Sequence, residues 1–173
     1  CRKMSASDWL ALDTEFIRER TYYPQLCLIQ IATADHIALI DPLAVNDLTP
    51  LFELLYAPNI VKIVHACHQD LEIFFHLCGQ APAPVFDTQL AAPLLGLAPQ
   101  SAYATLVHDL LGVHLSKAHA RADWRKRPLP NDWQNYAADD VRYLGPLHQM
   151  MTQQLKERDR LDWLSQDFAA LSD

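Results

Sequence analysis

The chain has 173 residues, of which 50% are hydrophobic and 20% are charged, and this balance predicts one compact domain and excludes a disordered segment. Its apolar runs are too short or too interrupted to cross a bilayer, so we expect no membrane association. The formal net charge of −7 argues against broad electrostatic binding to nucleic acid, although divalent cations bound to carboxylates would weaken that argument.

The chain opens with Cys1 rather than methionine and shows no basic stretch followed by an apolar one. We therefore expect a fragment of a longer protein, without a secretory signal. The four cysteines show no paired Cys-x-x-Cys spacing, which predicts reduced thiols and a cytoplasmic location.

Strand-like and helix-like segments alternate in the first half of the chain. Apolar runs predict four strands, at Trp9–Phe16, Leu26–Thr33, His36–Ile40 and Ile60–His65. The second and third should form a hairpin, because only the turn Ala34–Asp35 separates them. Two helices are predicted, at Asp47–Tyr56 with Asp47 as N-cap and at His68–Cys78 ended by Gly79.

The second half is predicted to be mainly helical. Short apolar pieces around Phe86 and Leu90–Leu95 precede a helix at Tyr103–Leu111, and residues 115–130 are polar and basic, as in a loop. A long helix should run from Asn131 to about Asp159, with a capping box between Asn131 and Gln134 and a kink at Gly145–Pro146. Strands alternating with helices, plus one hairpin, predict an α/β fold with a mixed sheet.

Two acidic residues, Asp13 and Glu15, lie at the end of the first predicted strand. Because strand side chains alternate, both point to the face that also carries Trp9 and Ala11. Two adjacent carboxylates repel each other unless a cation lies between them, and hard cations such as Mg²⁺ or Mn²⁺ prefer oxygen ligands. The alternative is an acidic strand end facing solvent, and the recurrence of Asp-x-Glu from Asp70 shows how weak the pattern is alone.

Two further segments carry candidate site residues. Tyr136 and Asp140 are four apart on a predicted helix and share one face, so a phenol would lie beside a carboxylate. Asp70 opens the helix that follows a buried strand, where sites form in open α/β sheets. The alternatives are a core tyrosine beside a surface Asp140, and an Asp70 that only favours the helix dipole.

Taken in chain order, Asp13-Thr-Glu15, His65-x4-Asp70 and Tyr136-x3-Asp140 resemble the three motifs of the DEDD superfamily of 3′→5′ exonucleases, in its tyrosine-bearing branch. Further segments are similar to bacterial ribonuclease D, at 38–43, 86–92, 123–129 and 135–144, so the resemblance covers nearly the whole chain. It implies a ribonuclease H-like fold, a mixed five-stranded sheet flanked by helices. Residues 1–173 would be the catalytic domain, lacking an N-terminal strand and C-terminal helical nucleic-acid-binding domains.

The resemblance also implies an activity. The expected enzyme is an exoribonuclease that releases nucleoside 5′-monophosphates from the 3′ end of RNA, using two divalent cations, Mg²⁺ or Mn²⁺. The expected metal ligands are Asp13, Glu15, Asp70 and Asp140, with Tyr136 orienting the attacking water. The implied partner is RNA with a free 3′ end, in tRNA 3′-end processing, and the implied state is a monomer in the cytoplasm. Two alternatives stay open: a DNA exonuclease of the proofreading or Werner-like type, and a catalytically inactive nucleic-acid-binding module.

Substrate contacts are predicted from charge and position. One basic cluster lies in the predicted loop and consists of Lys117, Arg121, Arg125, Lys126 and Arg127. We expect Lys117 and Arg127 to contact phosphates. Thr14, Phe16 and His65, which lie beside the candidate carboxylates in sequence, are further candidates for substrate binding. The alternatives are a solvated basic loop and a core position for Phe16.

Two other ligand classes are not expected. His65 and His68 have a spacing that could bind zinc, but a structural zinc site needs a second matched pair, and none is evident. The chain has only four glycines and no Gly-rich phosphate loop, which argues against nucleoside triphosphate binding.

Overall fold

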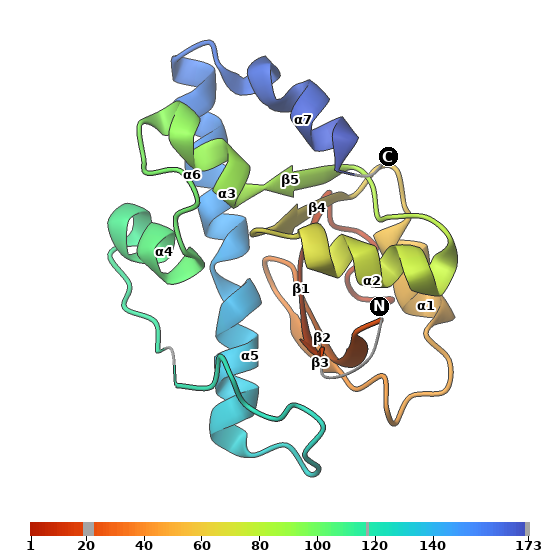
Figure 1. The fold of residues 1–173 in the computed structure, drawn as a ribbon. Helices are drawn as coiled ribbons and strands as arrows, with labels where there is room; N and C mark the ends of the chain where they lie inside the picture. The colour runs from red at the N-terminus through yellow and green to blue at the C-terminus, as the bar shows by residue number, and fades with distance from the viewer. Residues whose placement is uncertain (19–22, 117, 172–173) are drawn as a thin grey trace.

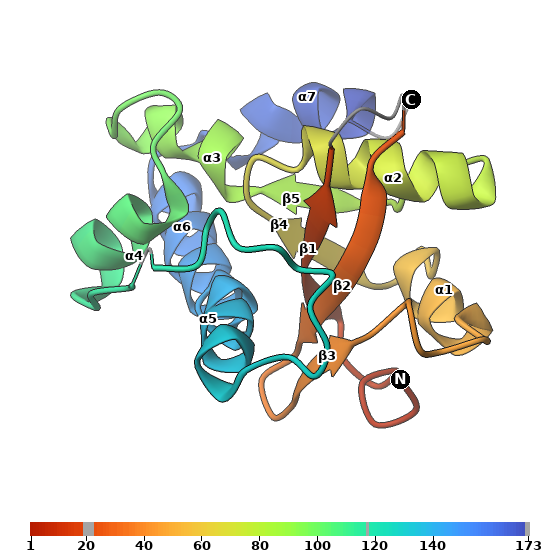
Figure 2. The same ribbon diagram turned by 60° about the horizontal axis from the view of Figure 1, so that its bottom comes forward.

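A computed structural model describes residues 1–18, 23–116 and 118–171 of the chain. Five strands form a mixed sheet in the order β3-β2-β1-β4-β5, with helices against both faces (Figures 1 and 2). The strands are β1 (Trp9–Ile17), β2 (Gln25–Ala32), β3 (Ile37–Ile40), β4 (Val61–Val64) and β5 (Val85–Asp87). The predicted mixed sheet of five strands is confirmed.

Strand β1 lies at the centre of the sheet and carries two of the candidate carboxylates. It pairs antiparallel with β2, where Asp13 lies opposite Gln30, and parallel with β4. The register between β1 and β2 shifts between Glu15 and Phe16, where Cys27 of β2 is skipped, as at a β-bulge. The predicted hairpin of β2 and β3 is confirmed, and the Thr33 N–H donates to the His36 carbonyl across its turn at 2.8 Å.

One face of the sheet packs against α1 (Thr49–Leu55) and α2 (His68–Cys78). Leu10, Leu12, Ile29 and Ile31 supply the sheet side of this core. Helix α2 has the predicted bounds, and Gly79 ends it with a φ of +75°, a left-handed conformation that glycine adopts readily.

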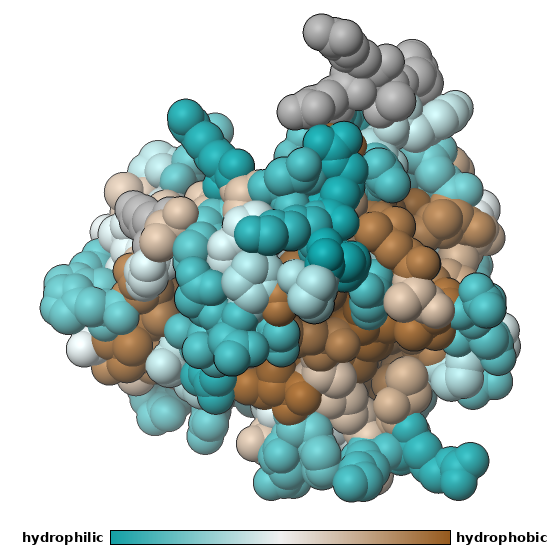
Figure 3. Space-filling view, turned by 90° about the horizontal axis from the view of Figure 1, so that it is seen from below, coloured by the Kyte–Doolittle hydropathy of each residue, from teal (hydrophilic) through white to brown (hydrophobic). Residues whose placement is uncertain are grey.

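The other face packs against α5 (Asn131–Arg142) and α6 (Leu144–Glu157). Figure 2 shows these two helices on the opposite side of the sheet from α1 and α2. The remaining elements are α3 (Thr88–Ala91), η1 (Ala92–Leu95), α4 (Tyr103–Leu111), η2 (Leu161–Leu164) and α7 (Ser165–Ala170). In the parts of the chain that the structure describes, no helix combines the length and the apolarity needed to cross a membrane. Seen from below, the surface mixes hydrophilic residues with separate hydrophobic patches (Figure 3).

The predicted long helix is two helices that meet at Tyr143. Pro146 has no N–H to donate to the carbonyl of Arg142, and its ring clashes with that carbonyl, so the helix breaks before the predicted kink. Gly145 is needed for packing, since a Cβ there would lie 2.3 Å from the Trp9 ring. The first turn of α6 therefore lies directly against β1.

Two predicted helix starts are wrong in detail. The N-cap of α1 is Leu48 rather than Asp47, although the Asp47 carboxylate accepts the Thr49 N–H at 2.9 Å. No capping box forms at α5, because its N-cap is Pro130 and the Gln134 side chain donates instead to the Leu129 carbonyl at 2.8 Å.

Candidate metal centre

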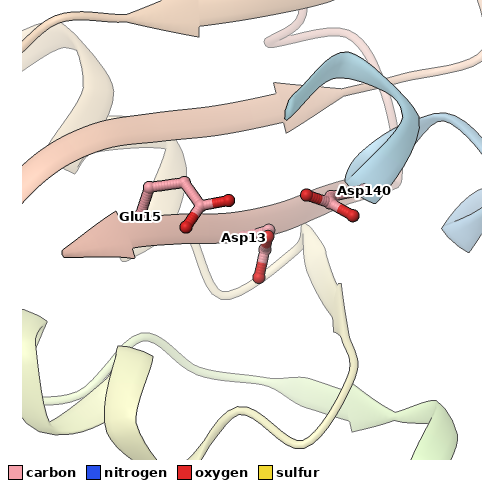
Figure 4. A group of neighbouring side chains, drawn as sticks. All are labelled: Asp13, Glu15 and Asp140. Atoms are coloured by element: carbon pink, nitrogen blue, oxygen red, sulfur yellow. The ribbon is translucent and has the colours of Figure 1, made fainter. Parts of the chain in front are cut away.

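Three carboxylates meet beside the second half of β1. One oxygen from each of Asp13, Glu15 and Asp140 lies within 4.8 Å of the other two. Figure 4 shows Asp13 and Glu15 on one strand and Asp140 on the neighbouring helix, α5. Because side chains alternate along β1, Asp13 and Glu15 lie on the face that α5 covers. Asp140 meets them there although it follows Glu15 by 125 residues. These three residues are called the carboxylate trio below.

Burial and mutual repulsion make the carboxylate trio difficult to ionise. Burial, followed by repulsion from Asp70, Asp140 and Glu15, raises the pKa of Asp13 well above its usual value. Burial and the charges of Asp140 and Asp70 raise the pKa of Glu15 to about 9, and burial followed by Asp139 raises the pKa of Asp140 to about 7. A divalent cation among these oxygens would favour their charged forms, and an all-oxygen donor set fits Mg²⁺ or Mn²⁺.

These pKa shifts predict a metal-free protein whose stability falls as pH rises. The folded pKa values of Glu15 and Asp140 lie above the unfolded values of about 4. The folded state therefore binds more protons than the unfolded state between about pH 4 and about pH 9, and the free energy of unfolding decreases with pH across that window.

Melting temperature measured against pH in EDTA checks this expectation. Other groups titrate in the same range, so Glu15→Gln is the matched comparison and should show a shallower decline than the parent chain. Saturating Mg²⁺ should raise the melting temperature most at the alkaline end of the window. If the melting temperature of Glu15→Gln fell as steeply with pH as that of the parent, the carboxylate trio would not be the cause of the pH dependence.

Asp70 lies beside the carboxylate trio rather than within it. It is in the first turn of α2, and only 8% of it is exposed. The Thr14 hydroxyl donates a hydrogen bond to its Oδ1. Burial raises the pKa of Asp70 to about 6, and its charge in turn raises the pKa values of Asp13 and Glu15. The structure thus gives Thr14, predicted to bind substrate, a hydrogen bond that orients Asp70.

The loop that leads into α2 is held by Asp87, which sequence reasoning did not single out. The Asp87 carboxylate accepts the N–H groups of Ala66 and Cys67, each at 3.1 Å, and caps α3 by accepting the Gln89 N–H at 2.8 Å. Ala66 has a φ of +54°, which is uncommon for a residue with a Cβ, so these bonds stabilise a strained turn. An aspartate directly before a threonine and a helical pattern was the signal available in the sequence.

Asp87→Ala should lower the free energy of unfolding by about 2–4 kcal/mol, because it removes a helix cap and leaves the buried N–H of Cys67 without an acceptor. Asp87→Asn keeps one acceptor oxygen and should lose less. Urea unfolding of the three metal-free proteins provides the comparison. An Asp87→Ala chain as stable as the parent would show that the turn does not depend on this carboxylate.

Tyr136 on α5 lies beside the carboxylate trio, and His65 lies on another element. His65 follows β4, with its Nδ1 at 2.9 Å from the Thr88 hydroxyl and its ring 5.7 Å from that of Tyr103, and burial lowers its pKa. Tyr136, on the side of α5 that faces the sheet, packs against Trp124 of the 115–130 loop. Together with Asp140 it lines a cavity of about 240 Å³. Burial, followed by the charges of the carboxylate trio, raises the pKa of Tyr136, so its phenol keeps its proton at neutral pH.

Arg127 was predicted to contact phosphate, but the structure gives its side chain another role. Its guanidinium pairs with both carboxylate oxygens of Asp41, at 2.5 and 2.8 Å, and donates to the carbonyls of Trp124, Lys126 and Cys27. These contacts occupy all five of its N–H groups. Arg127 therefore ties the 115–130 loop to the sheet and has no donor left for substrate.

The other predicted substrate contacts have mixed outcomes. Lys117 lies outside the described residues. Arg125 forms an ion pair with Asp123 at 2.7 Å. Phe16 is half-buried near the end of β1 and belongs to none of the core clusters of the described residues, which leaves it accessible near the site. Within the described ranges, the carboxylate trio is the one group of acidic, His or Cys side chains close enough to share a metal.

Comparisons with known proteins agree with this geometry. The chain is 46% identical to ribonuclease D of Gluconacetobacter diazotrophicus over 99% of its own length and 44% of that protein. The structure superposes on Escherichia coli RNase D with a TM-score of 0.91 and 39% identity, covering 100% of this chain and 47% of that one. It also superposes on Brucella melitensis NrnC with bound Mg²⁺, with a TM-score of 0.85 and 29% identity, covering 96% and 83% of the two chains.

The chain thus spans less than half of the ribonuclease D proteins that it matches. The resemblance to ribonuclease D and the ribonuclease H-like fold that it implied are confirmed. A family model described as 3′-5′ exonuclease matches residues 1–156. The chain belongs to this 3′-5′ exonuclease family.

Proposed function

We propose that this chain is the catalytic domain of an exoribonuclease that removes nucleoside 5′-monophosphates from the 3′ end of RNA. The observation that carries the proposal is the carboxylate trio, gathered from both ends of a chain of the 3′-5′ exonuclease family. RNA is favoured over DNA because the Escherichia coli relative is described as an exoribonuclease involved in structured RNA processing.

Asp13, Glu15 and Asp140, together with Asp70, would hold two divalent cations. Mg²⁺ is the favoured ion, because the oxygen ligands suit it and the related NrnC structure is described with bound Mg²⁺. Two cations at such a site supply Lewis-acid stabilisation of the charge that develops on the phosphate, and they lower the pKa of the attacking water. Thr14 holds Asp70 by its hydrogen bond, so the fourth carboxylate keeps its orientation beside the other three.

Tyr136 would orient the attacking water rather than take its proton. A phenol with an ordinary pKa of about 10 is already a poor base at neutral pH, and burial beside the carboxylate trio raises the pKa of Tyr136 further. Its hydroxyl can instead accept or donate one directional hydrogen bond next to Asp140. Phe16 and His65 would contact the terminal nucleotide.

The natural substrate would be a tRNA precursor, processed by a monomer in the cytoplasm. These assignments follow from the likeness to ribonuclease D. Segments outside residues 1–173 would supply part of the affinity for RNA, because the net charge of −7 and the full engagement of Arg127 leave few basic groups for phosphates.

Degradation of a 5′-labelled single-stranded RNA tests the proposal, with DNA of the same sequence as the comparison. The expected result is a ladder shortening from the 3′ end in Mg²⁺ or Mn²⁺, with nucleoside 5′-monophosphates as products and no cleavage in EDTA. Faster digestion of the DNA would favour the DNA exonuclease. Internal cuts, or full activity in EDTA, would contradict the proposed chemistry.

A further inference from the structure

Gln30 in β2 is fully buried, and its side-chain amide has no hydrogen-bond partner in the described parts of the chain. Its exposed fraction is 0%, and neither Oε1 nor Nε2 of its side chain bonds any residue that the structure describes. Buried amides in folded proteins are nearly always paired, because an unpaired one loses its hydration without compensation. Packing alone would favour an apolar side chain here, so the amide calls for a role beyond packing.

The position of Gln30 links it to the candidate metal centre. Gln30 lies directly opposite Asp13 in the antiparallel pair of β1 and β2, which places their Cβ atoms about 4.5–5.5 Å apart on the same sheet face. That face is the one covered by α5. Two residues before Gln30, Leu28 packs with Ala137 of α5, and two residues after it, Ala32 packs with Val141.

Asp13 already accepts the backbone N–H of Thr14, and its carboxylate can take a further donor that fixes its orientation toward a cation. Metal-binding carboxylates are held in orientation by hydrogen bonds from groups outside the ligand set. Thr14 donates its hydroxyl to Asp70, and Arg127 is fully engaged with the 115–130 loop and β2. The Gln30 amide has two N–H donors, lies across the strand pair from Asp13, and is free of other bonds among the described residues.

We propose that Gln30 is a positioning residue for the metal centre. When Asp13 is ionised and holds a cation, Nε2–H of Gln30 donates to its carboxylate and fixes the oxygen that faces the metal. A rotation of either side chain brings the two groups together, since they already face each other across neighbouring strands. This inference rests on the proposed function, because it needs the carboxylate trio to bind a cation.

Gln30→Met separates positioning from simple packing. Methionine is similar in length and apolar, so the metal-free melting temperature should equal or exceed that of the parent. The Kd for Mn²⁺, measured by calorimetric titration, should increase about 10- to 100-fold. A packing role predicts the reverse pattern, a lower melting temperature with unchanged Mn²⁺ affinity, and that result would overturn the proposal. Gln30→Leu is the second variant, and a large loss of metal-free stability in both would also overturn it.

Thr152→Val is the matched control. Thr152 on α6 carries another buried oxygen without a partner among the described residues, and it lines a cavity with Trp9 and Lys156 rather than the metal centre. Its removal should leave the Mn²⁺ affinity unchanged, and a loss equal to that of Gln30→Met would overturn the proposal.

Asp13→Asn distinguishes failure of the two proposals. Unchanged Mn²⁺ affinity in Asp13→Asn would refute the metal centre itself, and the role of Gln30 with it. If Asp13→Asn abolishes binding while both Gln30 variants stay within about twofold of the parent, only the positioning role is wrong.

Discussion

Replacing Asp13 with asparagine is expected to reduce RNA hydrolysis by a factor of at least about 10³, because loss of a ligand shared by the cation site removes several kcal/mol of transition-state stabilisation. The fold should survive. Burial and three neighbouring carboxylates make a charge on Asp13 unfavourable in the metal-free protein, so the neutral amide should hold or slightly raise the melting temperature in EDTA.

Two measurements on the same preparation check this expectation: the turnover rate on a 5′-labelled RNA in saturating Mg²⁺, and the melting temperature in EDTA. Asp35→Asn, in the exposed turn between β2 and β3, is the control and should keep full activity. An inactive Asp13→Asn chain that is also unfolded at the assay temperature would contradict this account of the site.

Tyr136→Phe should lower the turnover rate about 10²- to 10³-fold, because a positioned hydrogen bond in the transition state contributes a few kcal/mol. Affinities for Mn²⁺ and for RNA should stay nearly unchanged, since the ring still packs against Trp124. Tyr56→Phe is the matched control. The Tyr56 hydroxyl donates to the Gln80 carbonyl at 3.0 Å, far from the carboxylate trio, so its loss should affect stability but not turnover.

The pH profile distinguishes orientation from proton abstraction by Tyr136. If the phenol were the base, the rate of the parent would rise with pH until the phenol ionises, and that limb would vanish in Tyr136→Phe. If a cation-bound water is the titrating group, the limb should remain in Tyr136→Phe and move when Mn²⁺ replaces Mg²⁺. An unchanged rate with an unchanged profile would show that Tyr136 is only a packing residue.

Helix ends and hairpin turns were predicted correctly where they depend on a few neighbouring residues. Helices α2 and α4 have the predicted bounds because Gly79 and Gly112 supply the left-handed residue that ends a helix. The hairpin of β2 and β3 was readable from its short turn. Strand and helix periodicities predicted that Asp13 and Glu15 share one face and that Tyr136 and Asp140 share another, whereas the convergence of the carboxylate trio was implied by the family resemblance.

Contacts between distant segments were not predictable in the same way. Arg127 pairs with Asp41, which lies 86 residues away, and nothing near Arg127 in the sequence indicates that its donors are used. Thr14 donates to Asp70 across 56 residues, and nothing near Thr14 in the sequence indicates this hydrogen bond. In the sequence, Gln30 is one polar residue in an apolar strand. Its place opposite Asp13 follows only from the register between β1 and β2.

Anomalous diffraction from crystals soaked in Mn²⁺ would show whether the carboxylate trio binds cations. Two peaks about 3.5–4 Å apart are expected, coordinated by oxygens of Asp13, Glu15 and Asp140, with Asp70 turned toward one of them. If crystals soaked in saturating Mn²⁺ showed no anomalous peak at the carboxylate trio, or peaks only elsewhere on the molecule, the proposed metal centre would be wrong.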